Sequence, residues 1–233
     1  MRLFFYIVFF LFALCQLHAQ EKDYIEKDFV ETRDFHFKES LLFIRGAAIV
    51  PNVIANQGFR HSFKGIYEAN LSLNIRIASG FSLGVGMKNS LISTQERIQN
   101  VDIRMQLYTA FVRMGYTRYH TEKTYSALAI NMGYNNSFYT NVVSIYSPII
   151  TKKYNSLVFE PEYSINFAVE ENFAIGIFVS YAFFATPFEA KNIAMQDYSS
   201  LSTLGNTQAN GMLNVGFCFH IGMGTRFKPN FQD

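Results

Sequence analysis

Two carboxylates, Glu160 and Glu162, stand on either side of Pro161. Side chains at this spacing share one face of a β-strand, so the two acids would be neighbours. In a solvated cleft such a pair suits acid–base catalysis. In the narrow interior of a barrel it belongs instead to an ion-pair network, and we favour this second interpretation.

The histidines give weaker indications of chemistry. His61 is next to Ser62, and a histidine and a serine can act as base and nucleophile in catalysis. No motif in the sequence places an acidic partner beside them. We therefore expect a polar loop pair. His36, His120 and His220 are scattered and give no metal-ligand spacing. The sequence thus predicts no catalytic residue, no bound metal and no cofactor.

Strands that could position these side chains are indicated by alternation. From Tyr67 to Ile77 the odd positions are apolar and the even positions are polar, so a strand here has one apolar and one polar face. After Ala78–Gly80 the pattern resumes with unchanged parity, as a three-residue hairpin loop requires, and Gly80 suits the left-handed position that ends such a loop. The break Glu170–Asn172 repeats this arrangement, with Asn172 in place of glycine.

The whole chain is predicted to be all-β, an eight-stranded antiparallel up-and-down transmembrane β-barrel. Most strands are near the length, about nine to eleven residues, with which a tilted strand crosses a bilayer. We predict strands at 41–50, 66–78, 81–91, 103–118, 125–135, 157–169, 173–184 and 210–223, the last ending between Met223 and Phe227.

The connections predict the orientation. Those after the second, fourth and sixth strands are short, whereas the others are long, polar and centred on Asn56, Gln95, Tyr146 and Gln196. Outer-membrane barrels have short periplasmic turns and long external loops. We therefore expect the cell outer membrane, with both termini in the periplasm.

A soluble barrel or sandwich would also alternate, but the polar faces argue against it. They are rich in Gly, Ser, Ala and Asn, which fit a narrow lumen, while aromatic residues gather near the ends of the apolar faces. The composition, 49% hydrophobic with a net charge of +2, includes no basic block, so we expect no nucleic-acid partner.

The ends of the chain are expected to lie outside the barrel. Residues 1–19 have the features of a cleavable signal peptide: Arg2, an apolar stretch and a small-residue site before Gln20. Lipidation at Cys15 is an alternative that the bulky Leu14 disfavours. We assign 20–40 to a charged periplasmic lead-in, 41–227 to the barrel and 228–233 to a tail.

Two groups of residues are candidates for function. The first is a set of inward charges that should pair and fill the lumen: Arg45, Glu68, Arg76, Lys88, Arg113, Glu160 and Glu162. The second is the predicted loop 136–156, which is unusually apolar and contains Phe138, Tyr139 and Tyr146. This loop is expected to fold over the barrel mouth, to extend its two strands beyond the bilayer, or to bind a partner.

The predicted last strand carries a resemblance. Asn214 to Ile221 reads NVGFCFHI, which resembles the polar-x-Gly-x-x-apolar-x-apolar signal of outer membrane protein A-like and outer-membrane β-barrel-domain families. The resemblance covers about Leu41 to Phe227. It implies an eight-stranded barrel in contact with outer-membrane lipid and inserted by the barrel assembly machinery. Some barrels that resemble this one modify lipopolysaccharide with a His, a Ser and a carboxylate, so His61 and Ser62 leave a lipid-modifying enzyme as a remote alternative.

The function we favour is non-enzymatic: a structural or loop-mediated binding role for a barrel with a side-chain-filled lumen. An accessory barrel of a protein-secretion or envelope-assembly complex, with an envelope protein as partner, is one alternative. A small porin-like diffusion pore is another.

Overall fold

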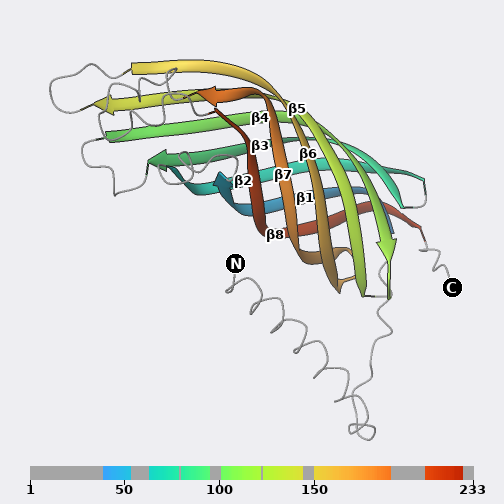
Figure 1. Ribbon diagram of the computed structural model, residues 1–233. Coiled ribbons are helices and arrows are strands. Elements are labelled where there is room, and N and C mark those ends of the chain that lie inside the picture. Colours follow the sequence, from blue (N-terminus) through green and yellow to red (C-terminus); the bar gives the residue numbers. More distant parts are fainter. Residues whose placement is uncertain are drawn as a thin grey trace, which may run out of the picture. The chain divides into compact units, whose positions relative to one another are not determined.

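The chain folds into a closed antiparallel barrel of eight strands connected in chain order (Figure 1). The computed structural model describes residues 39–53, 63–78, 80–94, 101–121, 123–143, 150–189 and 208–227. No helix in these ranges is long and apolar enough to cross a membrane. The strands are β1 (Glu39–Val53), β2 (Phe63–Ala78), β3 (Phe81–Thr94), β4 (Val101–Tyr119), β5 (Thr124–Val143), β6 (Ile150–Glu170), β7 (Phe173–Glu189) and β8 (Gln208–Phe227). The predicted fold class is confirmed.

Closure is made by β1 and β8, which pair from Glu39 opposite Phe227 to Val53 opposite Met212. Because Phe227 is paired, the last strand ends there and not at Met223. The same pairing places Glu39 and Ser40 in β1, although we expected them in the lead-in. Their strand character was hidden because charged residues precede them in the sequence.

The faces of the barrel follow the predicted parity. On β2, inward Ser72 is 2% exposed and outward Leu73 is 46% exposed. Outward apolar side chains continue along β3, β6 and β7 at odd positions and along β4 and β5 at even positions. A register shift between Gly65 and Tyr67 interrupts the alternation of β2, so that Phe63 is buried.

The short turns lie at one end of the barrel, called here the short-turn end. Gly80 has φ of 77°, in the left-handed region predicted for it, and its carbonyl accepts a hydrogen bond from the Thr117 N–H at 2.7 Å. The carbonyl of Asn172 accepts one from the Gly222 N–H at 2.7 Å. These bonds connect each turn to a neighbouring strand.

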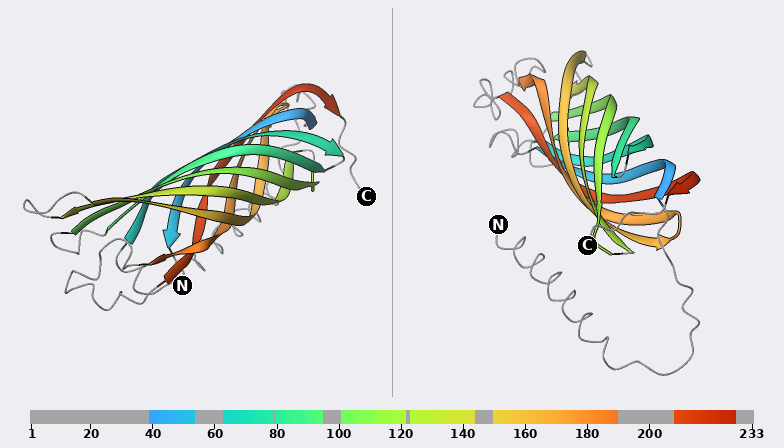
Figure 2. Two further views of the ribbon diagram at one scale, coloured as in Figure 1. Left: turned by 90° about the horizontal axis from the view of Figure 1, so that it is seen from above. Right: turned by 90° about the vertical axis from the view of Figure 1, so that its right-hand side faces the viewer.

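At the other end, called the long-connection end, β4, β5 and β6 continue beyond the predicted limits (Figure 2). β5 runs to Val143 and β6 begins at Ile150, so Phe138 and Tyr139 lie in a strand and not in a loop. We ended the strand where its outward apolar residues end, but backbone pairing continues from Asn136 opposite Asn155 to Asn141 opposite Ile150. Of the three alternatives named for this segment, extension of its two strands is the one that the described residues show.

Several predictions fall outside the described residues: His36, His61, Ser62, the centres of the long connections including Tyr146, the signal peptide, most of the lead-in and the tail.

Candidate functional site: the barrel interior

One ion-pair cluster, the Glu162 cluster, joins three strands across the lumen. Arg45 of β1 donates from Nη2 to Glu162 Oε1 of β6 at 2.6 Å. Arg113 of β4 donates to both carboxylate oxygens of Glu162, at 2.8 and 3.0 Å. Arg113 also reaches Asn131 Oδ1 at 3.0 Å. A two-pronged arginine–carboxylate contact fixes the geometry of both groups.

A second cluster, the Lys88 cluster, joins β3 to β2 and β6. Lys88 Nζ lies 2.7 Å from Glu160 Oε2 and 3.4 Å from Glu68 Oε1. Glu160 Oε1 also accepts from Ser180 Oγ at 2.6 Å and from Asn214 Nδ2 at 2.9 Å. The carboxylates thus obtain the partners that a buried charge requires.

The two clusters account for six of the seven charged residues predicted for the lumen: Arg45, Glu68, Lys88, Arg113, Glu160 and Glu162. All six side chains are at most 5% exposed. The neighbours Glu160 and Glu162 belong to different clusters and face different cations. This arrangement favours a structural role for the pair over acid–base catalysis, because both carboxylates are enclosed by protein groups.

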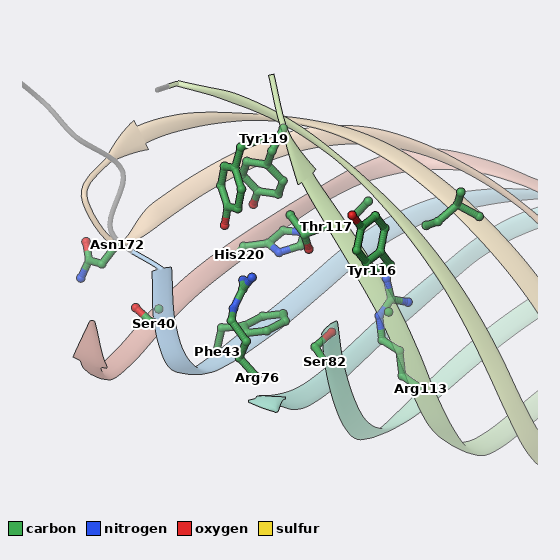
Figure 3. Close-up of a pocket in the computed structure, with 15 residues that line it drawn as sticks. Ser40, Phe43, Arg76, Ser82, Arg113, Tyr116, Thr117, Tyr119, Asn172 and His220 are labelled. Atoms are coloured by element: carbon green, nitrogen blue, oxygen red, sulfur yellow. The ribbon is translucent and has the colours of Figure 1, made fainter. Parts of the chain in front are cut away.

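Arg76 lies apart from the clusters, in a small cavity at the short-turn end (Figure 3). Its guanidinium lies 5.8 Å from the centre of the Phe43 ring, and that ring stacks on His220 at 5.9 Å. The cavity, of about 30 Å³, has room for a water molecule and not for an organic substrate. His220 makes ring contacts here, with Phe43 and with Tyr125.

The sequence did not reveal a third group, which we call the inner apolar group: Ile92, Ile103, Met105, Leu107, Phe184 and Met212. Each is at most 3% exposed, and each lies on its strand toward the long-connection end relative to the ion pairs. Ile92 and Met105 are register partners. The alternation of β4 is weak here because inward Leu107 is followed by outward Tyr108. This weak alternation was the one feature of the sequence that could have indicated inward apolar residues on β4.

The interior is therefore filled along its length, with charges in the middle and apolar side chains toward the long connections. Among the described residues, no three His, Cys, Asp or Glu side chains gather as metal ligands. Cys218 is buried and packs with Ala47, Ile49 and Phe178. The ion pairs connect strands that are not neighbours in the sheet, and an eight-stranded barrel has an interior about as wide as the side chains that fill it.

An apolar outer surface around an interior that contains ion pairs is found in membrane barrels, and comparison with solved structures agrees on the fold. Neisserial surface protein A (NspA) matches with a TM-score of 0.55 at 11% identity, over 79% of this chain and 98% of that one. The chain has the fold of a small outer-membrane β-barrel. At this identity the likeness extends to the fold alone.

Two further structures align over similar lengths. A major outer membrane protein from Thermus thermophilus has 10% identity and a TM-score of 0.48, over 77% of this chain and 99% of that one. The outer membrane protein OprG from Pseudomonas aeruginosa has 12% identity and a TM-score of 0.47, over 81% and 99%. No known protein family matches the chain, and no curated protein matches it.

Proposed function

We propose that this protein is a non-enzymatic barrel of the outer membrane whose function is to present a binding surface outside the bilayer. The observation that supports it most is the filled interior. Two clusters of buried ion pairs and the inner apolar group occupy the lumen. A lumen of this kind suits neither transport nor catalysis, so the outer parts of the molecule carry the role.

The surface we propose is the projecting sheet, defined as residues 101–107 of β4, 136–143 of β5 and 150–156 of β6. It begins at a register row of Asn89, Tyr108, Asn136 and Asn155, called here the amide row, which interrupts the run of outward apolar residues. Beyond that row the three strands remain paired. The sheet thus extends past the apolar belt as paired strands.

Aromatic contacts stabilise the projecting sheet. Tyr139 and Tyr154 meet edge to face at 5.2 Å between ring centres, and Phe138 meets Tyr108 at 5.9 Å. On the outward face, Lys153 Nζ lies 5.5 Å from the centre of the Phe138 ring. An outward aromatic ring such as that of Phe138 suits contact with another protein, because aromatic residues are enriched in binding interfaces.

The orientation belongs to the same proposal. Short turns in the periplasm and long connections outside would place the projecting sheet at the cell exterior and both termini in the periplasm. Insertion by the barrel assembly machinery is expected from the β8 sequence Asn214 to Ile221.

Site-specific photo-crosslinking in intact cells tests the proposal. A crosslinker at the outward positions Thr140 or Lys153 should capture a distinct envelope protein or an external ligand, whereas one at outward Met114, in the apolar belt, serves as the control. Capture of secretion or envelope-assembly components would select the accessory-barrel alternative. Equal products from all three positions would contradict a binding role for the projecting sheet.

A further inference from the structure

The projecting sheet has two lateral edges, and one of them is formed by β6. Pairing between β6 and β7 ends at Val158 opposite Phe184. On its other side β6 stays paired with β5 as far as Ile150 opposite Asn141. We call residues Ile150–Asn155 the β6 edge. Among the described residues, no strand pairs with this edge on the side of β7.

The residues at the end of the β6–β7 pairing explain why it stops. The Thr186 N–H donates to Ser156 Oγ at 2.9 Å, and Ser156 Oγ donates to the Leu157 carbonyl at 3.0 Å. A side-chain hydroxyl thus replaces the last backbone partner of the ladder. Pro187 comes next in β7 and has no N–H to donate. The residues of β7 that follow pair with β8 instead.

The opposite edge of the projecting sheet, formed by β4, is much shorter. β3 pairs with β4 up to Ser93 opposite Arg104. The N–H of Ile103, the neighbouring residue of β4, donates to Thr94 Oγ1 at 3.2 Å. The strand begins two residues before this contact. The β6 edge is therefore the better site for an added strand, because alternate N–H and C=O groups along Ile150–Asn155 have no strand partner among the described residues.

Charge indicates which kind of strand the β6 edge accepts. Lys153 is exposed on the outward face of the edge, and its Nζ lies 5.5 Å from the centre of the Phe138 ring. An acidic residue directly opposite Lys153 on an added strand would be stabilising. A second copy of this chain that paired through the same edge, centred on Lys153, would bring two lysines directly opposite each other. Such a like-charge pair is destabilising, and lysines on edge strands disfavour self-association.

We propose that the β6 edge binds an extended segment of another protein by strand addition, with backbone hydrogen bonds along Ile150–Asn155 and an acidic side chain opposite Lys153. The inference rests on the proposed function, because it specifies how the projecting sheet holds its partner. It differs from binding through the outward face of the sheet, which would leave the backbone groups of the β6 edge in water.

Amide hydrogen exchange of the full-length protein in detergent, measured by mass spectrometry, tests the edge before any partner is added. Amides of the β6 edge should on average exchange faster than those of residues 163–167, which belong to the same strand and are paired with both β5 and β7. Equal exchange rates in the two segments would mean that the β6 edge is already covered, and would overturn the proposal.

The next measurement adds short synthetic peptides of alternating valine and threonine with one central glutamate or one central lysine. At about ten times its dissociation constant, the glutamate peptide should slow exchange of the β6 edge about tenfold. The lysine peptide should bind more weakly. A glutamate peptide that is N-methylated throughout should give no protection, because it has no backbone N–H to donate. Equal protection by the N-methylated peptide would contradict strand addition and overturn the proposal.

A charge reversal tests the role of Lys153. Lys153→Glu should reverse the preference, so that the lysine peptide protects the β6 edge better than the glutamate peptide does. Lys123→Glu, which changes an exposed cation at the short-turn end, is the matched control and should keep the original preference. Heat-modifiable migration on gels verifies that both variants fold. An unchanged preference in Lys153→Glu would overturn the proposal, as would capture of a second copy of this chain by a crosslinker at Lys153.

This proposal and the proposed function can fail separately. A partner crosslinked at Thr140, together with equal exchange of the β6 edge and residues 163–167, would support the binding role and reject strand addition. Protection of the β6 edge by the glutamate peptide, with no partner crosslinked in cells, would support strand addition and reject the binding role.

Discussion

At the scale of single residues, the buried charges are costly unless they are paired. Glu160 accepts hydrogen bonds from Lys88, Ser180 and Asn214, at 2.7, 2.6 and 2.9 Å. Removing one partner of such a set leaves the other as an uncompensated buried charge. Replacing both partners with apolar groups removes the attraction between them and leaves no uncompensated charge behind. The stability of the barrel is therefore more sensitive to the loss of one member of an ion pair than to the replacement of both members by apolar residues.

Glu160→Ala should lower the free energy of unfolding by about 3–5 kcal/mol, because it leaves Lys88 with Glu68 alone. Urea titrations of the barrel in liposomes measure the loss. The double variant Glu160→Ala with Lys88→Met should recover part of it. Ser180→Ala, which removes one neutral donor to the same carboxylate, is the matched control and should cost less, about 1.5–3 kcal/mol. A double variant less stable than Glu160→Ala would contradict the pairing.

The charged residues of the interior could be predicted from the sequence, because odd or even position along a strand decides which face a side chain is on. Which of these residues pair with one another could not be predicted. Glu160 and Glu162 look like one site in the sequence, yet they bind different cations because the lumen is narrow and each faces a different strand. Pairing across a barrel depends on register, which short-range patterns do not specify. Parity also assigned Arg76 to the interior, and its guanidinium lies 5.8 Å from the centre of the Phe43 ring.

At the scale of elements, each strand combines a membrane-facing run with polar positions beyond it. On β4 the outward residues are apolar or aromatic from Tyr108 to Tyr116, with Arg104 and Arg118 exposed on either side. That run matches the roughly nine to eleven residues needed to cross a bilayer. The sequence predicted these crossings well. The lengths predicted for β5 and β6 were too short, because strands can pair through their backbones without an apolar outward face.

Placing a charge on the outward face should be costly in proportion to its depth. Leu73 lies near the middle of the outward apolar run of β2, and Ile77 lies at its end. Leu73→Arg should lower the free energy of unfolding by about 2–4 kcal/mol, and Ile77→Arg by about 0–1 kcal/mol. Ile177→Arg on β7 should resemble Leu73→Arg.

Folding titrations into liposomes compare these variants with Ser72→Arg, whose side chain starts from the interior. The cost of Ser72→Arg should reflect crowding of the lumen and should not change with bilayer thickness. Equal costs for Leu73→Arg and Ile77→Arg, or a monomer that stays soluble without detergent, would contradict the membrane assignment.

At the scale of the whole molecule, two kinds of side chains occupy the interior of the described barrel, one after the other along its axis. The Lys88 and Glu162 clusters cross the middle of the lumen, and the inner apolar group fills it toward the long-connection end. Eight strands enclose an interior just wide enough for side chains. We therefore predict that strand number and the size of the inward residues are enough to close the lumen to ions.

Planar-bilayer recordings test this closure. The unmodified monomer should show no sustained conductance. A triple variant with Arg45, Arg113 and Glu162 all changed to Ala should also stay closed, because Ile92, Met105 and Leu107 still fill the lumen beyond the missing ion pairs. Conductance that appears only after Met105→Gly and Leu107→Gly are added would show that the apolar filling is the second barrier. Steady conductance by the unmodified protein would favour the diffusion-pore alternative, since a filled lumen of this width has no continuous path for ions.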